Sequence, residues 1–255
     1  MTVSLDSITF SYSGEDLFRD FSLHFDDSSL TVILGPSGCG KTTLLHFLAG
    51  LRTPAKGNIS SPAFDHSTGE NTSAMQGDTK VFSRRTSCVF QEPRLFPWRT
   101  VSENVRIPLR NLYSENEIDD RVGCFLSLVG LEGREHAYPA ELSGGQRQRA
   151  SLARAFAFPS SLVLMDEPFQ SLDLPLRIQL MDVTLNLLKA EPRTVIAVTH
   201  DPREAIYLGN RVVVLGGRPV NVVLDRPVDL SSSDRSYSSS TSASFEALLF
   251  ASLVN

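Results

Sequence analysis

Apolar residues in this chain form short continuous runs that alternate with segments of helical periodicity. The runs at 30–34, 162–165 and 194–199 consist mainly of aliphatic and β-branched residues, which predicts buried strands. The apolar spacing at 44–48 and 116–130 instead predicts one face of a helix. Buried strands that alternate with helices are typical of an α/β fold built on a parallel sheet.

Three other segments of the chain follow different patterns. Residues 2–34 alternate in the manner of β-strands, whereas residues 57–80 have the composition of a loop, with room only for short edge strands. From 230 onward the chain is rich in Ser, which predicts a flexible link before a short apolar helix that docks on the rest. We therefore expect one domain over 1–228, followed by the link and helix over 229–255.

The segment between the strand at 30–34 and the helix after it matches the phosphate-loop pattern G-x-x-x-x-G-K-[ST]. The matching residues are Gly35, Gly40, Lys41 and Thr42. Glycines allow successive backbone N–H groups to surround phosphate oxygens at a helix N-terminus. Lys41 would reach the β- and γ-phosphates, and the Thr42 hydroxyl would ligate Mg²⁺. A chance match in a chain of this length is roughly 1%, so we expect a nucleoside triphosphate to bind.

Polar residues follow two of the other buried strands. Asp166 and Glu167 end the run at 162–165, at the sheet edge where α/β proteins place their ligands. Asp166 would hold Mg²⁺, and Glu167 would polarise an attacking water; a surface acidic pair is the alternative, although such pairs seldom follow buried residues. His200 follows the run at 194–199 and could hydrogen-bond a γ-phosphate, although a lone His is more often structural.

Two further features allow both a functional and a structural interpretation. Tyr12 lies in a turn before the phosphate loop and could stack on an adenine ring, or could be an exposed turn aromatic. Ser143, Gly144 and Gly145 precede a long helix and could form a second anion site, or an ordinary glycine-capped helix start.

The loop at 91–105 is unusually apolar for a connecting segment. It contains Leu95, Phe96 and Trp98, and loops of this composition usually pack on something. With the helix at 116–130, it predicts a small helical subdomain inserted in the α/β framework.

Composition and charge argue against several classes of protein. Hydrophobic residues make up 41% and charged residues 21% of the chain, as in ordinary globular proteins. The net charge of −5 argues against a nucleic-acid partner, and we find neither an apolar run of membrane-spanning length nor a basic leader. The three cysteines lack metal-ligand spacing, so we expect reduced thiols and a cytoplasmic location.

Together these motifs resemble those of the nucleotide-binding subunit of an ABC transporter, from residue 2 to about 225. The motifs follow the family's order: GPSGCGKTT (35–43), Gln91, LSGGQ (142–146), LVLMDEP (162–168), Ser171-Leu172-Asp173 and His200. LSGGQ separates this family from other phosphate-loop proteins. The resemblance implies a P-loop NTPase core with a mainly parallel sheet, an N-terminal antiparallel β subdomain and an inserted α-helical subdomain at about 92–158.

The resemblance also implies how the residues work. Two nucleotide-binding domains, an identical pair or paralogues, would pack head to tail and enclose ATP between the phosphate loop of one and LSGGQ of the other. Glu167, His200 and Gln91 would be catalytic, and Thr42, Gln91 and Asp166 would hold Mg²⁺. The implied ATP contacts are Tyr12, Gly35, Pro36, Ser37, Gly38, Cys39, Gly40, Lys41, Thr42, Thr43, Ser143, Gly144, Gly145, Gln146 and Asp173.

Within the family, QEPRLFPWRTV and THDPREAIYLGNRVVVL are similar to segments of importer ATPases for nitrate, sulfonate, taurine and thiamine precursors. This implies a peripheral subunit at the cytoplasmic face of the membrane, a permease partner and, through the complex, a substrate-binding protein. Leu95, Phe96 and Trp98 are the candidates for the permease contact, with core packing as the alternative. Less favoured are a soluble ABC ATPase acting on nucleic acid or ribosomes, and a phosphate-loop kinase or GTPase with a fortuitous LSGGQ.

Overall fold

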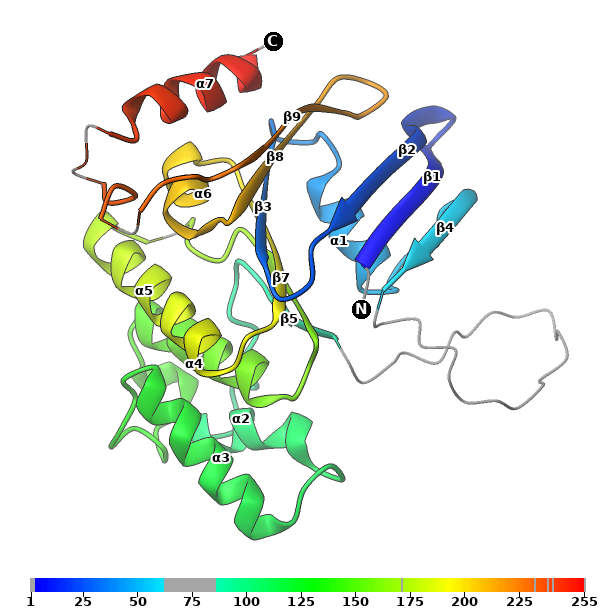
Figure 1. Cartoon of the computed structure of the whole chain (residues 1–255). Helices are drawn as coiled ribbons and strands as arrows, with labels where there is room; N and C mark the ends of the chain where they lie inside the picture. The colour runs from blue at the N-terminus through cyan, green and yellow to red at the C-terminus, as the bar shows by residue number, and fades with distance from the viewer. Residues whose placement is uncertain are drawn as a thin grey trace, which may run out of the picture. The chain divides into compact units, whose positions relative to one another are not determined.

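The computed structural model describes residues 3–61, 86–170, 172–231, 233–237, 239 and 241–254 (Figure 1). They belong to two compact units, Met1–Thr86 with Thr194–Asn255, and Ser87–Arg193. No described helix has the length and apolar character to cross a bilayer. The expected division at 228 stays a prediction.

In the first unit a small antiparallel sheet contains the N-terminus. Strand β1 (Val3–Tyr12) lies between β2 (Glu15–Phe25) and β4 (Lys56–Ser60), as Figure 1 shows in blue to cyan. Leu5 of β1 pairs with Leu23 of β2, and both are buried, as the alternation predicted. The predicted antiparallel β subdomain is confirmed. Of the segment at 57–80, residues 62–80 lie outside the described residues.

A second sheet in this unit is mainly parallel. Strand β3 (Leu30–Leu34) lies between β7 (Thr194–Thr199) and β8 (Arg211–Gly216), parallel to both, and β9 (Asn221–Pro227) pairs antiparallel with β8. All residues of β3 and β7 are buried, because central parallel strands are covered on both faces. The predicted parallel core is confirmed.

The described helices of the first unit are α1 (Lys41–Leu48), α6 (Pro202–Leu208) and α7 (Ala243–Val254). Helix α7 packs on α6 and β8 and buries Leu249. Glu246 of α7 accepts a hydrogen bond from Arg203 of α6 at 2.7 Å. In the Ser-rich link, Arg235 donates to the carbonyl oxygens of Gly209, Val228 and Leu230, so this part of the link is attached to the unit.

The second unit is mainly helical. Strand β5 (Thr86–Val89) neighbours β6 (Leu162–Asp166), and the helices are α2 (Val101–Arg106), α3 (Glu115–Leu128), α4 (Gly144–Ala157) and α5 (Leu174–Ala190). Short 3₁₀ turns occupy Ile107–Leu109 and Pro139–Glu141. Helices α2, α3 and α4 pack on one another (green in Figure 1) around buried Val105, Phe125 and Leu152.

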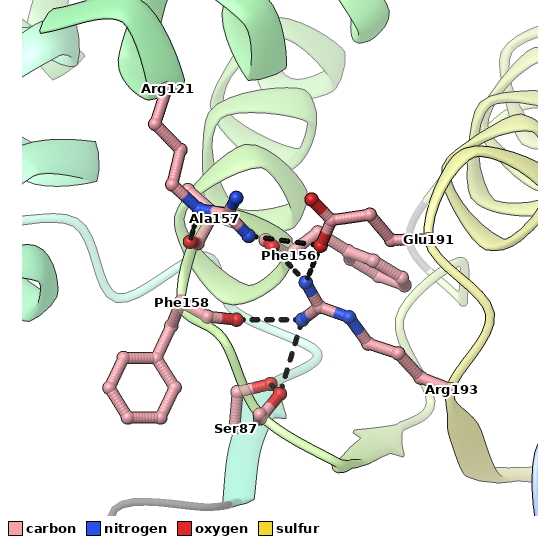
Figure 2. Close-up of polar contacts among 8 residues, drawn as sticks. Ser87, Arg121, Phe156, Ala157, Phe158, Glu191 and Arg193 are labelled. Atoms are coloured by element: carbon pink, nitrogen blue, oxygen red, sulfur yellow. Dashed lines mark hydrogen bonds and ion pairs between the residues drawn. The ribbon is translucent and has the colours of Figure 1, made fainter. Parts of the chain in front are cut away.

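Buried Arg193 holds the C-terminal end of α4 (Figure 2). Its guanidinium donates to the carbonyl oxygens of Phe156 and Phe158, each at 2.7 Å, and to the Ser160 hydroxyl at 3.3 Å. These bonds satisfy carbonyls that a helix end leaves without intrahelical partners. A cation at this end also interacts favourably with the helix dipole.

Arg121 of α3 completes this Arg193 cluster by bonding the Ala157 carbonyl oxygen. Glu191 accepts from Arg121 at 2.9 Å and also from Arg193. Burial alone would raise the pKa of Glu191, but the hydrogen bonds from both arginines lower it below its ordinary value. The cluster therefore joins α3, the end of α4 and the segment after α5.

Candidate nucleotide site

The phosphate loop connects β3 to α1 and is shaped by its glycines. Gly40, the N-cap of α1, has a φ of 96°, in the left-handed region that favours glycine. A Cβ on Gly35 would lie 2.6 Å from Sγ of Cys39 and 2.8 Å from the Leu215 carbonyl oxygen. The loop therefore packs closely against itself and β8, and its backbone can approach a ligand without intervening side chains.

The N-terminal end of α1 has the electrostatics of an anion site. The first backbone N–H groups of a helix lack intrahelical acceptors, and the first turn of α1 contains no acidic residue. Lys41 is buried, and its Nζ donates to the carbonyl oxygens of Gly35 at 2.8 Å and Pro36 at 3.0 Å. The ammonium is thus held against the loop itself, where it adds positive charge.

Tyr12 ends β1 beside the first turn of α1. Its hydroxyl lies 3.4 Å from Oγ1 of Thr43. Its ring contacts the Phe10 ring edge-on, with the two ring centroids 4.9 Å apart. Tyr12 is 43% exposed. Arg52 lies over it, with Cζ 5.1 Å from the ring centroid; the sequence offers no pattern that singles out this arginine.

His200 lies at the same sheet edge as the phosphate loop. Leu34 and Thr199 are partners in the parallel register of β3 and β7, so the residues that follow them, Gly35 and His200, leave the sheet side by side. His200 is exposed. The turn around it is fixed because Asp201 caps α6 by accepting from the Arg203 N–H at 2.8 Å.

In the second unit, the two carboxylates lie at the C-terminal end of β6. The residues at 162–165 are buried, while Asp166 and Glu167 are partly exposed at the strand end. Glu167 has a φ of 45°, a left-handed conformation that is uncommon for residues with a side chain. Burial and the nearby Asp166 charge raise the pKa of the Cys88 thiol to about 11.

Gln91 follows β5 and is exposed. Its Nε2 donates to Oε1 of Gln170 at 2.5 Å. Gln170 lies three residues after Glu167, and its own N–H donates to the Glu167 carbonyl oxygen at 3.4 Å. The fold thus joins Gln91 to the turn after the acidic pair. Nothing in the sequence marked Gln170 as part of this site.

The LSGGQ segment begins α4 with a capping box. Ser143 Oγ accepts from the Gln146 N–H at 3.3 Å, and Gln146 Oε1 accepts from the Ser143 N–H at 3.0 Å. Ser143 and Gly144 are exposed, but Gly145 is buried, and a Cβ there would lie 2.5 Å from Cδ2 of Leu176. Gly145 therefore serves the packing of α4 on α5, and the exposed end keeps the character of an anion site.

Asp173 is the N-cap of α5. Its carboxylate accepts from the Leu176 N–H at 3.4 Å, and the residue is exposed. Its neighbour Ser171 lies outside the described residues. The implied contact of Asp173 with ATP stays a prediction.

The apolar loop after Gln91 is held from both sides. Arg154 of α4 donates to the carbonyl oxygens of Pro93 and Arg94, each at 2.9 Å. The buried Asn104 of α2 accepts from the Phe96 N–H at 2.7 Å. Despite this support, Phe96 is 38% exposed and Trp98 69% exposed, and their rings contact each other at 5.7 Å. Neither aromatic is a core residue, which disfavours the core-packing alternative for them.

These residues fit ATP and Mg²⁺. The phosphate loop offers N–H donors and Lys41 for a polyphosphate. Mg²⁺ prefers oxygen ligands and usually takes part of its shell from substrate phosphates and water. Thr42, Gln91 and Asp166 each carry an oxygen atom of the kind that Mg²⁺ prefers. Among the described residues there is no cluster of three or more His, Cys, Asp and Glu side chains that could hold a metal ion by itself.

Comparison with known proteins decides the family. The family model described as ABC transporter matches residues 18–170, which include the phosphate loop, Gln91, LSGGQ and the acidic pair. The chain belongs to this family. As an ABC ATPase it binds and hydrolyses ATP, which confirms the predicted enzyme class.

Its relatives are ATP-binding subunits. The aliphatic sulfonates import ATP-binding protein SsuB of Bacillus cereus is 36% identical over 225 residues, covering 86% of this chain and 83% of that protein. An uncharacterized ABC transporter ATP-binding protein of Methanocaldococcus jannaschii is 40% identical over 220 residues, covering 84% of this chain and 78% of that protein.

Solved structures agree on the fold. A dimeric ATP-binding cassette bound to ADP and Pi, 27% identical, has a TM-score of 0.73 and covers 91% of this chain and 100% of that chain. A chain from the cbiONQ complex of Clostridium perfringens is 24% identical and has a TM-score of 0.75. The match covers 89% of this chain and 88% of that chain. The predicted fold class is thereby confirmed, while the individual site residues remain predictions.

Proposed function

We propose that this chain is the ATP-hydrolysing subunit of an importer and that it works at the cytoplasmic face of the membrane, bound to a separate permease. The observation that carries the partnership is the loop around Phe96 and Trp98. Its backbone is anchored by Arg154 and Asn104, yet it leaves two large aromatic side chains exposed. Exposed aromatic anchors on a rigid support are typical of interface hot spots.

The partner that fits this surface is a short helix of the permease. The apolar face of a helix can pack against exposed aromatic side chains, and preorganisation of the receiving surface lowers the entropic cost of binding. Leu95, Phe96 and Trp98 would form the contact, and a substrate-binding protein would act only through the permease. The relatives named for aliphatic sulfonates make such compounds the first solutes to test.

For hydrolysis, Lys41 and the N–H groups at the start of α1 would bind the phosphates. Glu167 would accept a proton from the attacking water, Gln91 would orient that water, and His200 would hydrogen-bond the γ-phosphate. Mg²⁺, held by Thr42, Gln91 and Asp166, would neutralise charge on the phosphates. The position of His200 beside the phosphate loop supports its role.

The ATP site would be completed by a second nucleotide-binding domain. Ser143 and Gly144 are exposed at the start of a 14-residue helix without acidic residues in its first turn, so they can bind a phosphate held by a partner. Tyr12 would stack on the adenine. Two such domains close with two-fold or pseudo-two-fold symmetry, and ATP-driven closure would move the permease.

The experiment is co-expression with a candidate permease subunit, followed by co-purification. The Phe96→Ala, Trp98→Ala double variant is expected to lose most of the permease while keeping its basal ATPase activity. Phe250→Ala is the matched control, because Phe250 is also exposed but lies on α7 in the other unit. Unchanged association of the double variant would contradict the proposed contact.

A further inference from the structure

Helix α4 carries a buried polar side chain two residues after the end of LSGGQ. Gln148 is 3% exposed, and its Nε2 donates two hydrogen bonds. One goes to the Phe90 carbonyl oxygen at 3.2 Å, and the other to the Pro168 carbonyl oxygen at 2.8 Å. The two acceptors lie 58 and 20 residues away in the sequence, so the side chain joins distant parts of the unit.

The amide of glutamine suits this position. A side-chain amide has two N–H donors on one nitrogen, and both acceptors are carbonyl oxygens, so the orientation of the Gln148 amide is fixed. The carboxylate of aspartate or glutamate would place its oxygens against the two carbonyl oxygens. Asparagine is one methylene too short to keep both bonds. Removing the donors would deprive two carbonyl oxygens of these partners, that of Pro168 in a buried place and that of Phe90 in a partly buried one.

The two acceptors flank residues of the reaction. Phe90 directly precedes Gln91, and Pro168 directly follows Glu167. The two segments are joined again by the hydrogen bond between Gln91 and Gln170. Gln148 is thus bonded to the backbone beside both side chains assigned to the attacking water.

We propose that Gln148 is a positioning residue, which holds Gln91 and Glu167 of its own protomer in the geometry for hydrolysis. The inference rests on the proposed function, in which those two residues orient and deprotonate the water. It assigns Gln148 no contact with the nucleotide.

The direct test is Gln148→Met, which keeps the length of the side chain and removes both donors. We expect kcat for ATP hydrolysis to fall about tenfold to a hundredfold, because small misplacements of reacting groups cost this much. KM for ATP is expected to stay unchanged, since the phosphate loop lies in the other unit. Gln179→Met is the control: Gln179 is exposed on α5 and accepts a hydrogen bond from Arg149 at 3.0 Å.

A merely structural role gives a different result. Thermal unfolding would then occur at lower temperature, but kcat per folded molecule would equal that of the parent, and the proposal would be overturned. If Gln148→Met does not fold, Gln148→Asn serves instead, because it can keep one bond; a parental kcat in that variant would overturn the proposal equally. If Glu167→Gln itself leaves hydrolysis intact, the proposed function has failed rather than this inference.

Dimers of two different variants show whether Gln148 acts on the catalytic residues of its own protomer or on those of its partner. One protomer carries Glu167→Gln, so only its partner's catalytic carboxylate is active. Gln148→Met is expected to lower turnover when placed in the partner, and to leave it unchanged when placed in the Glu167→Gln protomer. Equal losses in both arrangements, or a loss only in the second, would overturn the assignment to the same protomer.

Discussion

Gln91 donates a hydrogen bond from Nε2 to Oε1 of Gln170 at 2.5 Å, joining the residue after β5 to the turn after β6. The bond is solvent-exposed, so Gln170→Leu should change the free energy of unfolding by no more than about 0.5–1.5 kcal/mol. Because Gln91 then loses its orientation, we expect kcat to fall about tenfold. Gln179→Leu is the matched exposed control, and equal kcat values for the two variants would contradict the role of this contact.

The adjacent glycines of LSGGQ should respond differently to alanine. Gly145→Ala places a Cβ against Leu176 and should destabilise the unit by about 1–3 kcal/mol, an effect that Leu176→Ala should relieve. Gly144 has open space, with its nearest neighbour 4.0 Å away, so Gly144→Ala should leave stability unchanged and impair hydrolysis through the phosphate contact. Urea unfolding and ATPase assays on the three variants check both statements, and equal unfolding midpoints for the two alanine variants would contradict the packing argument.

The three cysteines should react with a maleimide in a fixed order. Cys124 is exposed, whereas burial raises the pKa of the Cys39 thiol, and burial with the Asp166 charge raises the pKa of Cys88 to about 11. Near neutral pH the latter two thiols are almost fully protonated and shielded. Peptide mapping should find the fast label on Cys124, and Cys124→Ser should remove it; fast labelling of Cys88 would contradict this environment.

Glu191 should make stability depend on pH in the acid range. Its folded pKa lies below the ordinary 4.5, so its pairing with Arg121 and Arg193 stabilises the protein above that pH and is lost as pH falls through the lowered value. The midpoint of urea unfolding should therefore drop on acidification, and drop less steeply in Glu191→Gln. Parallel pH profiles for the two proteins would contradict the pairing.

The sequence predicted the parts of this fold that are encoded locally. The strands at 30–34 and 194–199 appear where aliphatic runs placed them, and the phosphate loop follows from a contiguous motif. Helix α4 was expected from its glycines and apolar face, since caps and periodicity act over a few residues.

Contacts between distant residues could not be predicted in the same way. Gln148 resembles any other polar residue of the helix, and its partners become visible only when β5 and β6 bring two carbonyl oxygens to it. Likewise nothing in the sequence distinguishes the buried Arg193 from a surface arginine, and nothing there shows that Gly145 packs against Leu176. Such roles depend on which elements pack together, and a single sequence does not state this.

The central claim is that Glu167 drives ATP hydrolysis within a closed pair of nucleotide-binding domains. Glu167→Gln keeps the size of the side chain but removes its capacity to accept a proton. We expect the variant to bind ATP, to lose nearly all turnover and to elute as an ATP-bound dimer in gel filtration with MgATP, while the parent protein with ADP elutes as a monomer. Turnover at the parental rate, or a variant that binds ATP without forming a dimer, would contradict the account.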